Sequence, residues 1–476
     1  MTQASPLAET FPAASDADWR ILVEKTLKDA PFDSLRRATA EGLAIEPLYP
    51  ASSTTATFAP RAHDPEQPWD VRVSIAHPDA AQANADLLTD LAGGATSAVI
   101  SLDPTGQAGV AVGSAADLAR VLDGVLLEMA PIALDAGFLG PRAADWLAAA
   151  AKGSPTALLA FHLDPLSAFA KTGSIPGPIE SHLISAATVA ARLAQAHPKA
   201  GLFLASGRVV HEAGGGEAGE LAFALAAAVT YAKALVRAGL PMAEAFAGIA
   251  LGLSADADYF ASLAKHRAAR VLWTRMTGAC GVNLPAWIES RSSGRMLTVQ
   301  DPWTNMLRLA AAAVGASLGG ADAVVLGTFT DAIGLPIPFA RRQSRNTQFV
   351  LMEEAHLGRV ADPGAGSGYV EALTDEIARA AWAQFQTIEA QGGLIAALAS
   401  GHVAAEVARV RAARDAAGPP KIVGVTAFPP TQAAPVQTVS VTPRPAEAPS
   451  IRLPGPDGAC PPLNPIRLAE PHEAAR

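Results

Sequence analysis

Short apolar runs alternate with longer alanine-rich stretches from about Trp69 onward. The runs typical of buried strands are WDVRVSIA, TSAVISLD, MAPIALDAG, TALLAFHLDP, GLFLASG and ADAVVLGTF. Stretches such as DAAQANADLLTDLAGG and GELAFALAAAVTYAKALVRAG lie between them and have the composition of packed helices. Strands that alternate with helices form parallel sheets with helical crossovers. About eight such units over roughly 350 residues predict an α/β fold, a (β/α)8 TIM barrel, although residues 270–299 fit neither element clearly.

The two ends of the chain differ from this pattern. Residues 16–28 predict an amphipathic helix that Asp16 or Asp18 could cap. Its apolar stripe consists of Trp19, Leu22, Val23 and Leu27. An extended arm follows this helix, and after residue 428 prolines every few residues predict an extended, polyproline-like tail. We therefore expect an N-terminal helix and arm at residues 1–65, a barrel at 66–428 and a proline-rich tail at 429–476.

Composition argues against several partners and locations. Half of the residues are apolar and 17% are charged, which is enough for a large buried core. The net charge of −9, without a lysine or arginine cluster, argues against nucleic acid as a partner. No uncharged apolar run approaches the roughly 18 residues of a membrane span, and the first residues do not resemble a secretory signal. Cys280 and Cys460 cannot form a disulfide framework, which fits the cytoplasm. We expect one cysteine in the core and the other on the tail.

Residues 206–215 read S-G-R-V-V-H-E-A-G-G. They resemble a motif of the methylmalonyl-CoA mutase family that reads S-G-Y-H-M-x-E-A-G-A in catalytically competent members. Further blocks in family order extend the resemblance over most of the chain: HRAARVLW, SSGRMLTVQDPWTNMLR, LPIPFARRQSRNTQ and EEAHLGRVADPGAGSGYVEALTDEIARAAWAQFQTIEAQGG. The E-E-x-H-L-x-R-V-x-D-P run and the G-V-T-A-F-P ending resemble in particular the small, or beta, subunit of two-subunit bacterial enzymes.

The resemblance implies that the side chains of the family's chemistry are replaced here. Arg208 and Val209 stand where a tyrosine and a histidine face the reacting thioester. Ser74 replaces a tyrosine that helps to steer the radical, and Glu289 replaces a substrate-facing histidine. Valine can neither donate nor accept a hydrogen bond, and losing a positioned proton donor typically costs about 10²–10⁴ in rate. We therefore expect no catalytic residue in this chain.

Positions that bind substrate in the family are replaced as well. Gln67 stands where an arginine meets a phosphate of coenzyme A, and Arg291 stands where the family has a glutamine. The carboxylate of Glu289 would also place negative charge near the thioester of an anionic acyl group. We therefore expect no substrate-binding residue.

The family's active subunit adds a cobalamin domain whose Asp-x-His-x-x-Gly motif supplies the cobalt ligand. The printed sequence has no such motif, so we expect no cobalamin-binding domain and no cofactor or metal bound by this chain. The resemblance implies a non-catalytic small subunit of adenosylcobalamin-dependent methylmalonyl-CoA mutase. Its holoenzyme would interconvert (R)-methylmalonyl-CoA and succinyl-CoA in propionate metabolism, with cobalamin held by the large, or alpha, subunit.

The large subunit is the partner that this interpretation implies. We expect the N-terminal helix to contact it through Trp19, Leu22 and Leu27. Two alternatives remain open. The chain could be an active acyl-CoA mutase barrel that uses cobalamin from a separate small chain. It could also be a binding or regulatory protein of unrelated partnership that inherited the barrel.

Two polar or glycine-rich segments have structural explanations. Residues 364–368, G-A-G-S-G, predict a turn before a helix at Glu371, because a phosphate-binding loop would end in Gly-Lys-Ser/Thr. A second segment holds His211, Glu212, Glu217 and Glu220. It lacks the HExxH spacing, so we expect its acids at a helix start and not around a metal.

Two further side chains are placed only by their motifs. His162 follows an apolar run, and we expect a hydrogen-bonded structural histidine that could lie at the barrel mouth. We also hypothesise that Arg208 pairs with Glu289 and fills the vacated pocket with an ion pair.

Overall fold

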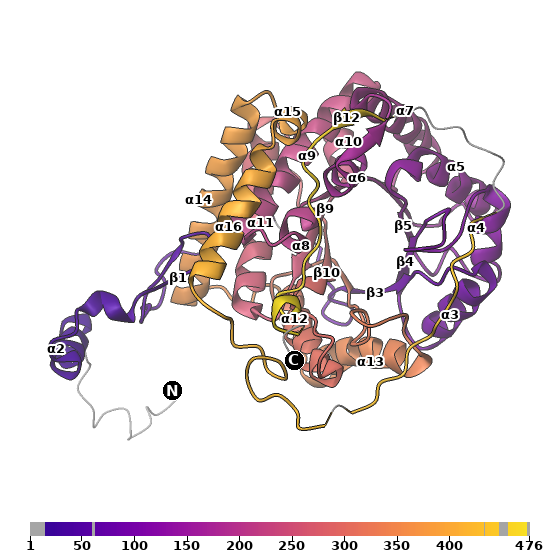
Figure 1. Ribbon diagram of the computed structural model, residues 1–476. Coiled ribbons are helices and arrows are strands. Elements are labelled where there is room, and N and C mark those ends of the chain that lie inside the picture. Colours follow the sequence, from indigo (N-terminus) through magenta and orange to yellow (C-terminus); the bar gives the residue numbers. More distant parts are fainter. Residues whose placement is uncertain (1–14, 60–61, 433, 447–455, 474–476) are drawn as a thin grey trace, which may run out of the picture.

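A closed barrel of parallel strands forms the centre of the molecule. The computed structural model describes residues 15–59, 62–432, 434–446 and 456–473; the start of the chain, where no secretory signal is expected, lies largely outside them. The barrel strands are β3 (Asp70–Ile75), β4 (Ser97–Ser101), β5 (Ile132–Asp135), β6 (Leu159–Leu163), β8 (Gly201–Ser206), β9 (Ile249–Ala255), β10 (Ile288–Ser292) and β11 (Ala323–Val325). They pair in this order, and β11 closes the ring against β3 (Figure 1). The predicted TIM-barrel fold is confirmed.

Helices surround the barrel (Figure 1). They are α3 (Ala80–Ala92), α4 (Ala115–Val121), α5 (Gly140–Ala150), α6 (Pro165–Thr172), α7 (Ile179–Ala196), α8 (Arg208–Glu212), α9 (Glu217–Arg237), α10 (Met242–Ala247), α11 (Tyr259–Ala279), α12 (Asn305–Leu318) and α13 (Pro338–Phe349). A second layer on one side holds α14 (Gly368–Ala390), α15 (Leu394–Ala399) and α16 (His402–Ala416). Helix α9 is long and apolar enough to cross a membrane, but 67% of its apolar window is buried in the molecule, as in the core helix of a globular protein.

Short helical turns connect these elements. They are η1 (Phe32–Leu35), η2 (Gly137–Leu139), η3 (Ala151–Gly153), η4 (Gly294–Met296), η5 (Pro302–Thr304) and the π-helical turn η6 (Val350–Glu354). The glycine run at residues 364–368 ends where α14 begins, and the backbone N–H of Gly366 donates to Glu371 in the first turn of that helix. The predicted turn is confirmed.

Side chains of the strands alternate between the helix layer and the lumen. Ile75 and Ile100 pack outward into the large core that the helices cover. Val99, Ala133 and Val325 form a separate apolar layer with Ala160 inside the barrel. Typical TIM barrels fill the lumen with branched apolar side chains. Here Ala133 and Ala160 are small, which leaves room in the lumen for polar side chains.

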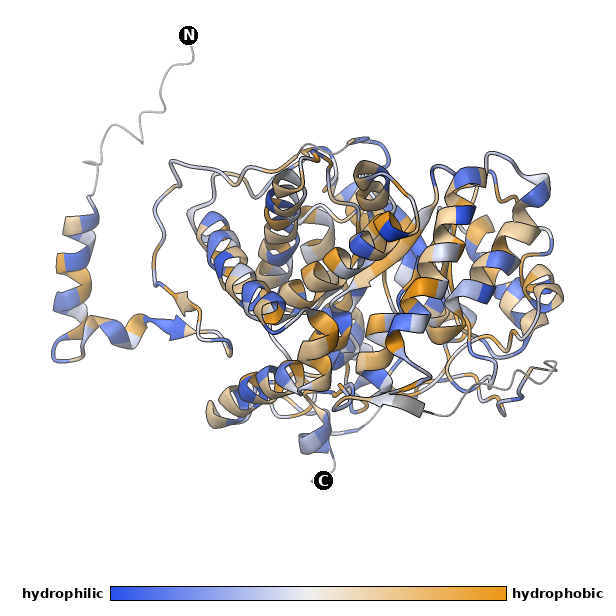
Figure 2. Ribbon diagram, turned by 90° about the horizontal axis from the view of Figure 1, so that it is seen from above, coloured by the Kyte–Doolittle hydropathy of each residue, from blue (hydrophilic) through white to orange (hydrophobic). Residues whose placement is uncertain are grey.

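The N-terminal helix α2 (Asp16–Leu27) stands apart from the barrel (Figures 1 and 2) and carries both hydrophilic and hydrophobic residues. Ser15, and not Asp16 or Asp18, is its N-cap; Asp18 instead closes the capping box by accepting the backbone N–H of Ser15. The Ser15 hydroxyl accepts the backbone N–H of Asp18 in the first turn, which Asp16 and Asp18 lie too far along the helix to do. After the helix, β1 (Arg37–Ala38) and β2 (Ala44–Ile45) form a small antiparallel hairpin within the arm.

The described part of the tail follows the loops at the carboxyl ends of the barrel strands. Strand β12 (Pro456–Ala459) pairs antiparallel with β7 (Ser174–Pro176), and the tail ends in α17 (Glu470–Glu473). Between them, the backbone N–H groups of Ile466 and Leu468 donate to the carbonyls of Glu212 and Arg295. The tail therefore packs on its own barrel.

One cysteine lies on the tail, as expected, but the other does not lie in the core. Cys460, on the tail, is the buried one, and Cys280 is exposed. Because β12 pairs with β7, the thiol of Cys460 lies near the backbone carbonyl of Phe169. Cys280 is exposed because it follows the last residue of α11.

Candidate functional site

The motif at residues 206–215 lies at the carboxyl end of β8, where TIM barrels carry their active sites. Gly207 follows the strand, and its N–H donates to the carbonyl of Gly252 on the neighbouring strand at 3.0 Å. A Cβ at this glycine would lie 2.0 Å from the backbone oxygen of Glu220. Gly207 is therefore required by close packing of the backbone, independently of any chemistry.

A buried carboxylate occupies the lumen below this motif. Glu289, on β10, is fully buried. Its Oε2 accepts a hydrogen bond from Arg72 at 2.9 Å, and its Oε1 accepts one from Arg291 at 2.8 Å. Arg72 also donates to Ser97 and Asp70. Residues two apart on β10 point to the same side, so Glu289 and Arg291 both face the lumen.

This network extends across the barrel. Arg291 donates from Nη1 to the Asp135 carboxylate on β5 at 2.8 Å. Strands β10 and β5 lie four positions apart in the ring of eight, so the pair joins opposite sides of the lumen. Below it, the Trp287 ring stacks near the Arg72 guanidinium, whose Cζ lies 5.2 Å from the ring centroid. The lumen is therefore crossed by the protein's own side chains.

The charges in the lumen hold one another in fixed ionisation states. Burial alone would raise the pKa of Glu289, but Arg291, His162 and Arg72 outweigh it and hold that pKa far below its usual range. Burial works against the charge of Arg291 as well, and its two carboxylate partners raise its pKa above the usual value. His162 is different: burial lowers its pKa to about 4, so its imidazole is neutral at pH 7.

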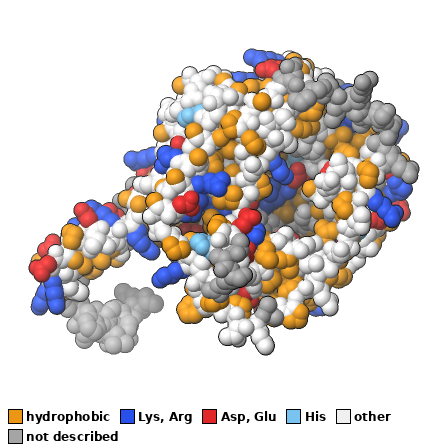
Figure 3. Space-filling view, in the orientation of Figure 1, with side chains coloured by type: hydrophobic (Ala, Val, Ile, Leu, Met, Phe, Trp, Pro, Cys, Tyr) orange, Lys and Arg blue, Asp and Glu red, His pale blue; other side chains and the backbone are white. Residues whose placement is uncertain are grey.

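The hypothesised ion pair between Arg208 and Glu289 is wrong. Arg208 forms no ion pair within the part of the chain that the structure describes, and its Nε is buried without a hydrogen-bond partner. Glu289 is already held by Arg72 and Arg291, which lie on the barrel wall itself and reach it directly. The Lys and Arg side chains at the hollowed mouth of the barrel are visible in Figure 3.

The other substituted positions are spread over the barrel. Val209 is half-buried and packs against the large core, and Ser74 lies on β3 at a lumen-facing position. Gln67 is exposed at the approach to the amino end of β3, the opposite end from Arg208. The structure therefore brings Glu289 and Arg291 together and leaves the other substituted residues apart.

Two members of the lumen network were not expected from the sequence: Arg72 as an ion-pair partner and Asp135. His162 Nδ1 lies 3.7 Å from Glu289 but has no hydrogen-bond partner, so the expected hydrogen-bonded histidine is not what this nitrogen shows. The alternation I-E-S-R-S of β10 was the available signal, since charges at every second strand position indicate a polar lumen.

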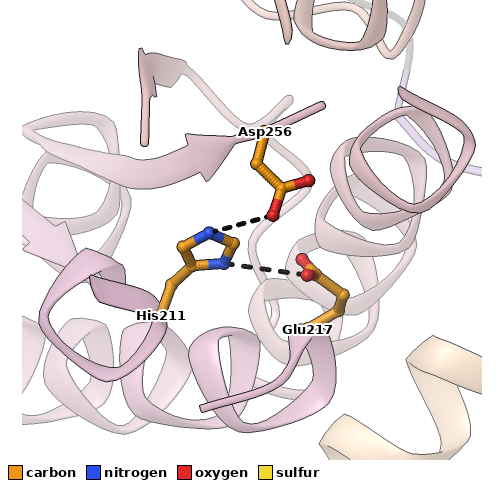
Figure 4. A group of neighbouring side chains, drawn as sticks. All are labelled: His211, Glu217 and Asp256. Atoms are coloured by element: carbon orange, nitrogen blue, oxygen red, sulfur yellow. Dashed lines mark ion pairs between the residues drawn. The ribbon is translucent and has the colours of Figure 1, made fainter. Parts of the chain in front are cut away.

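A second charged cluster lies beside α8. His211 Nε2 is 3.5 Å from Asp256, and its Nδ1 is 3.7 Å from Glu217 (Figure 4). One ligand atom from each of these three residues lies within 4.8 Å of the others, a spacing that could hold a metal ion. However, Lys265 and Arg295 already pair with the two carboxylates, and a cation would meet both positive charges.

The acids of this cluster start a helix, as the sequence predicts. Glu217 and Glu220 lie in the first turn of α9. Glu220 also bonds the backbone of Ser254 and the ammonium of Lys265, the latter at 2.6 Å. Burial opposes the charge of Asp256, but Arg295 and His211 lower its pKa to about 2. The cluster therefore fixes α8, α9 and the loop after β9 to one another.

Comparison with known proteins identifies the barrel. The family model for methylmalonyl-CoA mutase matches residues 59–452. The chain belongs to the methylmalonyl-CoA mutase family. It is 40% identical to the methylmalonyl-CoA mutase small subunit of Streptomyces virginiae, over 89% of this chain and 72% of the relative. It is 35% identical to the small subunit of Propionibacterium freudenreichii subsp. shermanii, over 83% of this chain and 65% of the relative.

The methylmalonyl-CoA mutase of Escherichia coli (strain K12) is a further relative, 30% identical over 81% of this chain and 59% of its own length. The chain thus spans less than two thirds of the length of several relatives that it matches. Among these mutases, the chain is most similar to small subunits.

Proposed function

We propose that the chain is the non-catalytic small subunit of an adenosylcobalamin-dependent methylmalonyl-CoA mutase. Its holoenzyme interconverts (R)-methylmalonyl-CoA and succinyl-CoA, and the large subunit carries out the reaction. The observation that supports this most is the Arg291–Asp135 ion pair across the lumen. An acyl-CoA chain cannot pass through the middle of a barrel while this bridge stands.

The residues at the mouth support the same proposal. A radical beside a thioester needs a positioned donor in a pocket that excludes water. Val209 offers no donor, and Ser74 is too short to replace an aromatic ring at that position. The guanidinium of Arg208 carries a permanent charge and no transferable proton near neutral pH.

Adenosylcobalamin fits the described residues poorly. A lower cobalt ligand would have to be an accessible imidazole, and both candidates near the mouth are buried: His211 is fully buried and His162 is 5% exposed. His211 also has carboxylates facing both of its ring nitrogens. Cobalamin therefore belongs, in this proposal, to the large subunit, and no step of the reaction passes through this chain.

The N-terminal helix supports a role in assembly. Ile21 and Leu22 on α2 are each 63% exposed, and Leu48 further along the arm is 49% exposed. Trp19 is half-buried against Phe32, with ring centroids 6.0 Å apart, and Leu27 is half-buried. We propose that the large subunit covers this face, with Leu22 as the most available of the three expected contacts. The acidic chain with unpaired cysteines supports a cytoplasmic complex.

An activity assay on three samples tests the proposal. The chain alone, the large subunit alone and the two together are each given adenosylcobalamin and succinyl-CoA, and methylmalonyl-CoA is measured. We expect turnover only where the large subunit is present, with more activity or stability in the complex. Turnover by the chain plus a separate cobalamin-binding protein would instead establish the active-barrel alternative. A stable chain that does not bind the large subunit would favour an unrelated binding role.

A further inference from the structure

A single acidic side chain ties the front of the N-terminal arm to the barrel. Glu41 lies in the turn between β1 and β2, and its Oε2 accepts the backbone N–H of Ala218 at 3.0 Å. Its Oε1 accepts the N–H of Gly219 at 3.1 Å. Both donors belong to the first turn of α9, whose N–H groups have no partner within the helix. Gly216, the N-cap residue of α9, has no side chain that could cap the helix. Glu41, from the hairpin, therefore caps α9 in its place.

The barrel side of this contact is shaped for Glu41. A Cβ at Gly216 would lie 2.0 Å from the Glu41 carboxyl carbon and 2.5 Å from its Oε1. Any residue larger than glycine would therefore displace the carboxylate. Gly216 has extended backbone with φ −102° and ψ −178°, which every residue can adopt, so the glycine is needed for space and not for conformation.

Few other contacts hold the hairpin, although Tyr49 directly after it packs on Tyr369 of α14, with ring centroids 5.2 Å apart. Among the described residues 15–48, Glu41 alone makes hydrogen bonds to the barrel. Leu43 and Ile45 pack beside it against the large core, and both are only half-buried. Helix α2 projects away from the barrel in both ribbon views (Figures 1 and 2). The direction in which α2 leaves the molecule therefore depends on the hairpin that Glu41 anchors.

We propose that Glu41 is a latch that fixes the arm on the N-terminus of α9 and so presents the exposed face of α2 to the large subunit. The latch is inferred from the geometry of this chain alone, whereas the identity of the partner rests on the proposed function. A helix N-terminus attracts a carboxylate through its unpaired N–H groups and its partial positive charge. Because the arm is already ordered before it binds the partner, binding costs less conformational entropy of the arm.

Glutamine is the informative conservative substitution. Burial, together with the nearby Glu217 charge, raises the pKa of Glu41, although the backbone N–H groups at the start of α9 work against this. Glu41→Gln removes the buried charge and keeps one oxygen that can accept an N–H, but its NH2 group would face the other N–H donor, so it should retain only part of the latch. Glu41→Ala removes both acceptors and leaves two backbone donors unpaired.

Hydrogen exchange of the full-length chain tests the latch without any partner. We expect Glu41→Ala to raise amide exchange across residues 37–48 at least about tenfold, as for a segment that opens locally. Gly216→Ala should do the same, because its Cβ displaces the carboxylate from the other side. Glu41→Gln should raise exchange less than Glu41→Ala does, because one of the two N–H donors keeps its acceptor. Glu46→Ala is the matched control, since Glu46 lies in the same arm and, within the part of the chain that the structure describes, its side chain forms one ion pair, with the exposed Arg36.

Affinity for the large subunit tests the second half of the proposal. Calorimetric titration should show a Kd about tenfold weaker for Glu41→Ala and Gly216→Ala, and a native value for Glu46→Ala. Unchanged exchange in both latch variants overturns the latch. A released arm with native affinity overturns the presentation of α2. Failure of the native chain to bind the large subunit contradicts the proposed function and leaves the exchange result standing.

Discussion

Arg291 and Asp135 join opposite walls of the barrel through a 2.8 Å ion pair between β10 and β5. The same guanidinium bonds the fully buried Glu289, so one arginine compensates two carboxylates, of which only Glu289 is buried; the Asp135 side chain is 49% exposed. Burying charges costs free energy unless each has a partner, and removing one member of a buried set leaves the others uncompensated. The lumen network therefore stabilises the fold only while it is complete.

Replacing Arg291 with methionine should destabilise the chain strongly. Glu289 is fully buried and would keep Arg72 but lose its second partner, whereas Asp135 is half exposed and would be solvated by water instead, so the cost comes from Glu289. We expect a loss of about 3–5 kcal/mol in the free energy of unfolding, measured by urea denaturation.

Arg192→Met is the control for this measurement. Arg192 pairs with Asp145 on the surface, where both side chains are about half exposed. Such pairs contribute about 0–1 kcal/mol. A loss below about 1 kcal/mol for Arg291→Met as well would show that the lumen pair is no more stabilising than a surface pair.

Two buried histidines should make stability depend on pH. Burial lowers the pKa of His162 to about 4 and that of His266 to about 4. Between about pH 6.5 and 4 the unfolded chain binds protons that the folded chain does not, so stability falls as pH falls through this window. Each histidine contributes about 1.4 kcal/mol per pH unit. Burial raises the pKa of Asp164 to about 7, which contributes with the opposite sign.

Comparing how steeply the free energy of unfolding changes with pH in different variants isolates the contribution of His266. Unfolding free energies from pH 7 to 4.5 should decline less steeply for His266→Gln than for the native chain. His356→Asn is the control, because His356 is exposed and asparagine tolerates its positive φ of 55°. Parallel curves for all three proteins would show that His266 does not titrate in this way.

The sequence predicts the barrel because six of its strands are apolar runs between helical stretches. The sequence pattern does not predict β9 and β10, for different reasons. β9 is buried at every position, so it has no alternation that separates a strand from a buried helix segment. β10, I-E-S-R-S, is polar because its charges pair inside the lumen and not with solvent. Such partners come from strands distant in sequence and no local pattern encodes them.

The candidate site is predictable only in outline. The replaced motif positions are visible in the sequence, and the structure brings Glu289 and Arg291 together. The pairing of Arg208 was wrong, because nearness in a motif does not determine which of several arginines reaches a carboxylate. Arg72 reaches Glu289 from two strands away in the ring, a relation that depends on strand order.

Gly207→Ala tests whether the motif at residues 206–215 is maintained for shape. Its Cβ would lie 2.0 Å from the Glu220 backbone oxygen, which cannot swing aside as a side chain could. We expect a loss of about 2 kcal/mol or more in thermal or urea unfolding. Gly153→Ala has no atom within 4 Å of its added methyl group and should change stability by about 0.5 kcal/mol at most. Equal effects of the two substitutions would contradict the packing explanation.

Restoring the family's side chains at the mouth should not restore catalysis. The double variant Arg208→Tyr with Val209→His returns the aromatic ring and the imidazole to their motif positions. The ion pair between Arg291 and Asp135 would still cross the lumen, and Trp287 would still stack on Arg72 below it. We expect no methylmalonyl-CoA from succinyl-CoA with adenosylcobalamin when this variant is assayed alone. Native affinity for the large subunit would show that the variant is folded, and turnover above that of the native chain would mean that the crossed lumen does not exclude substrate.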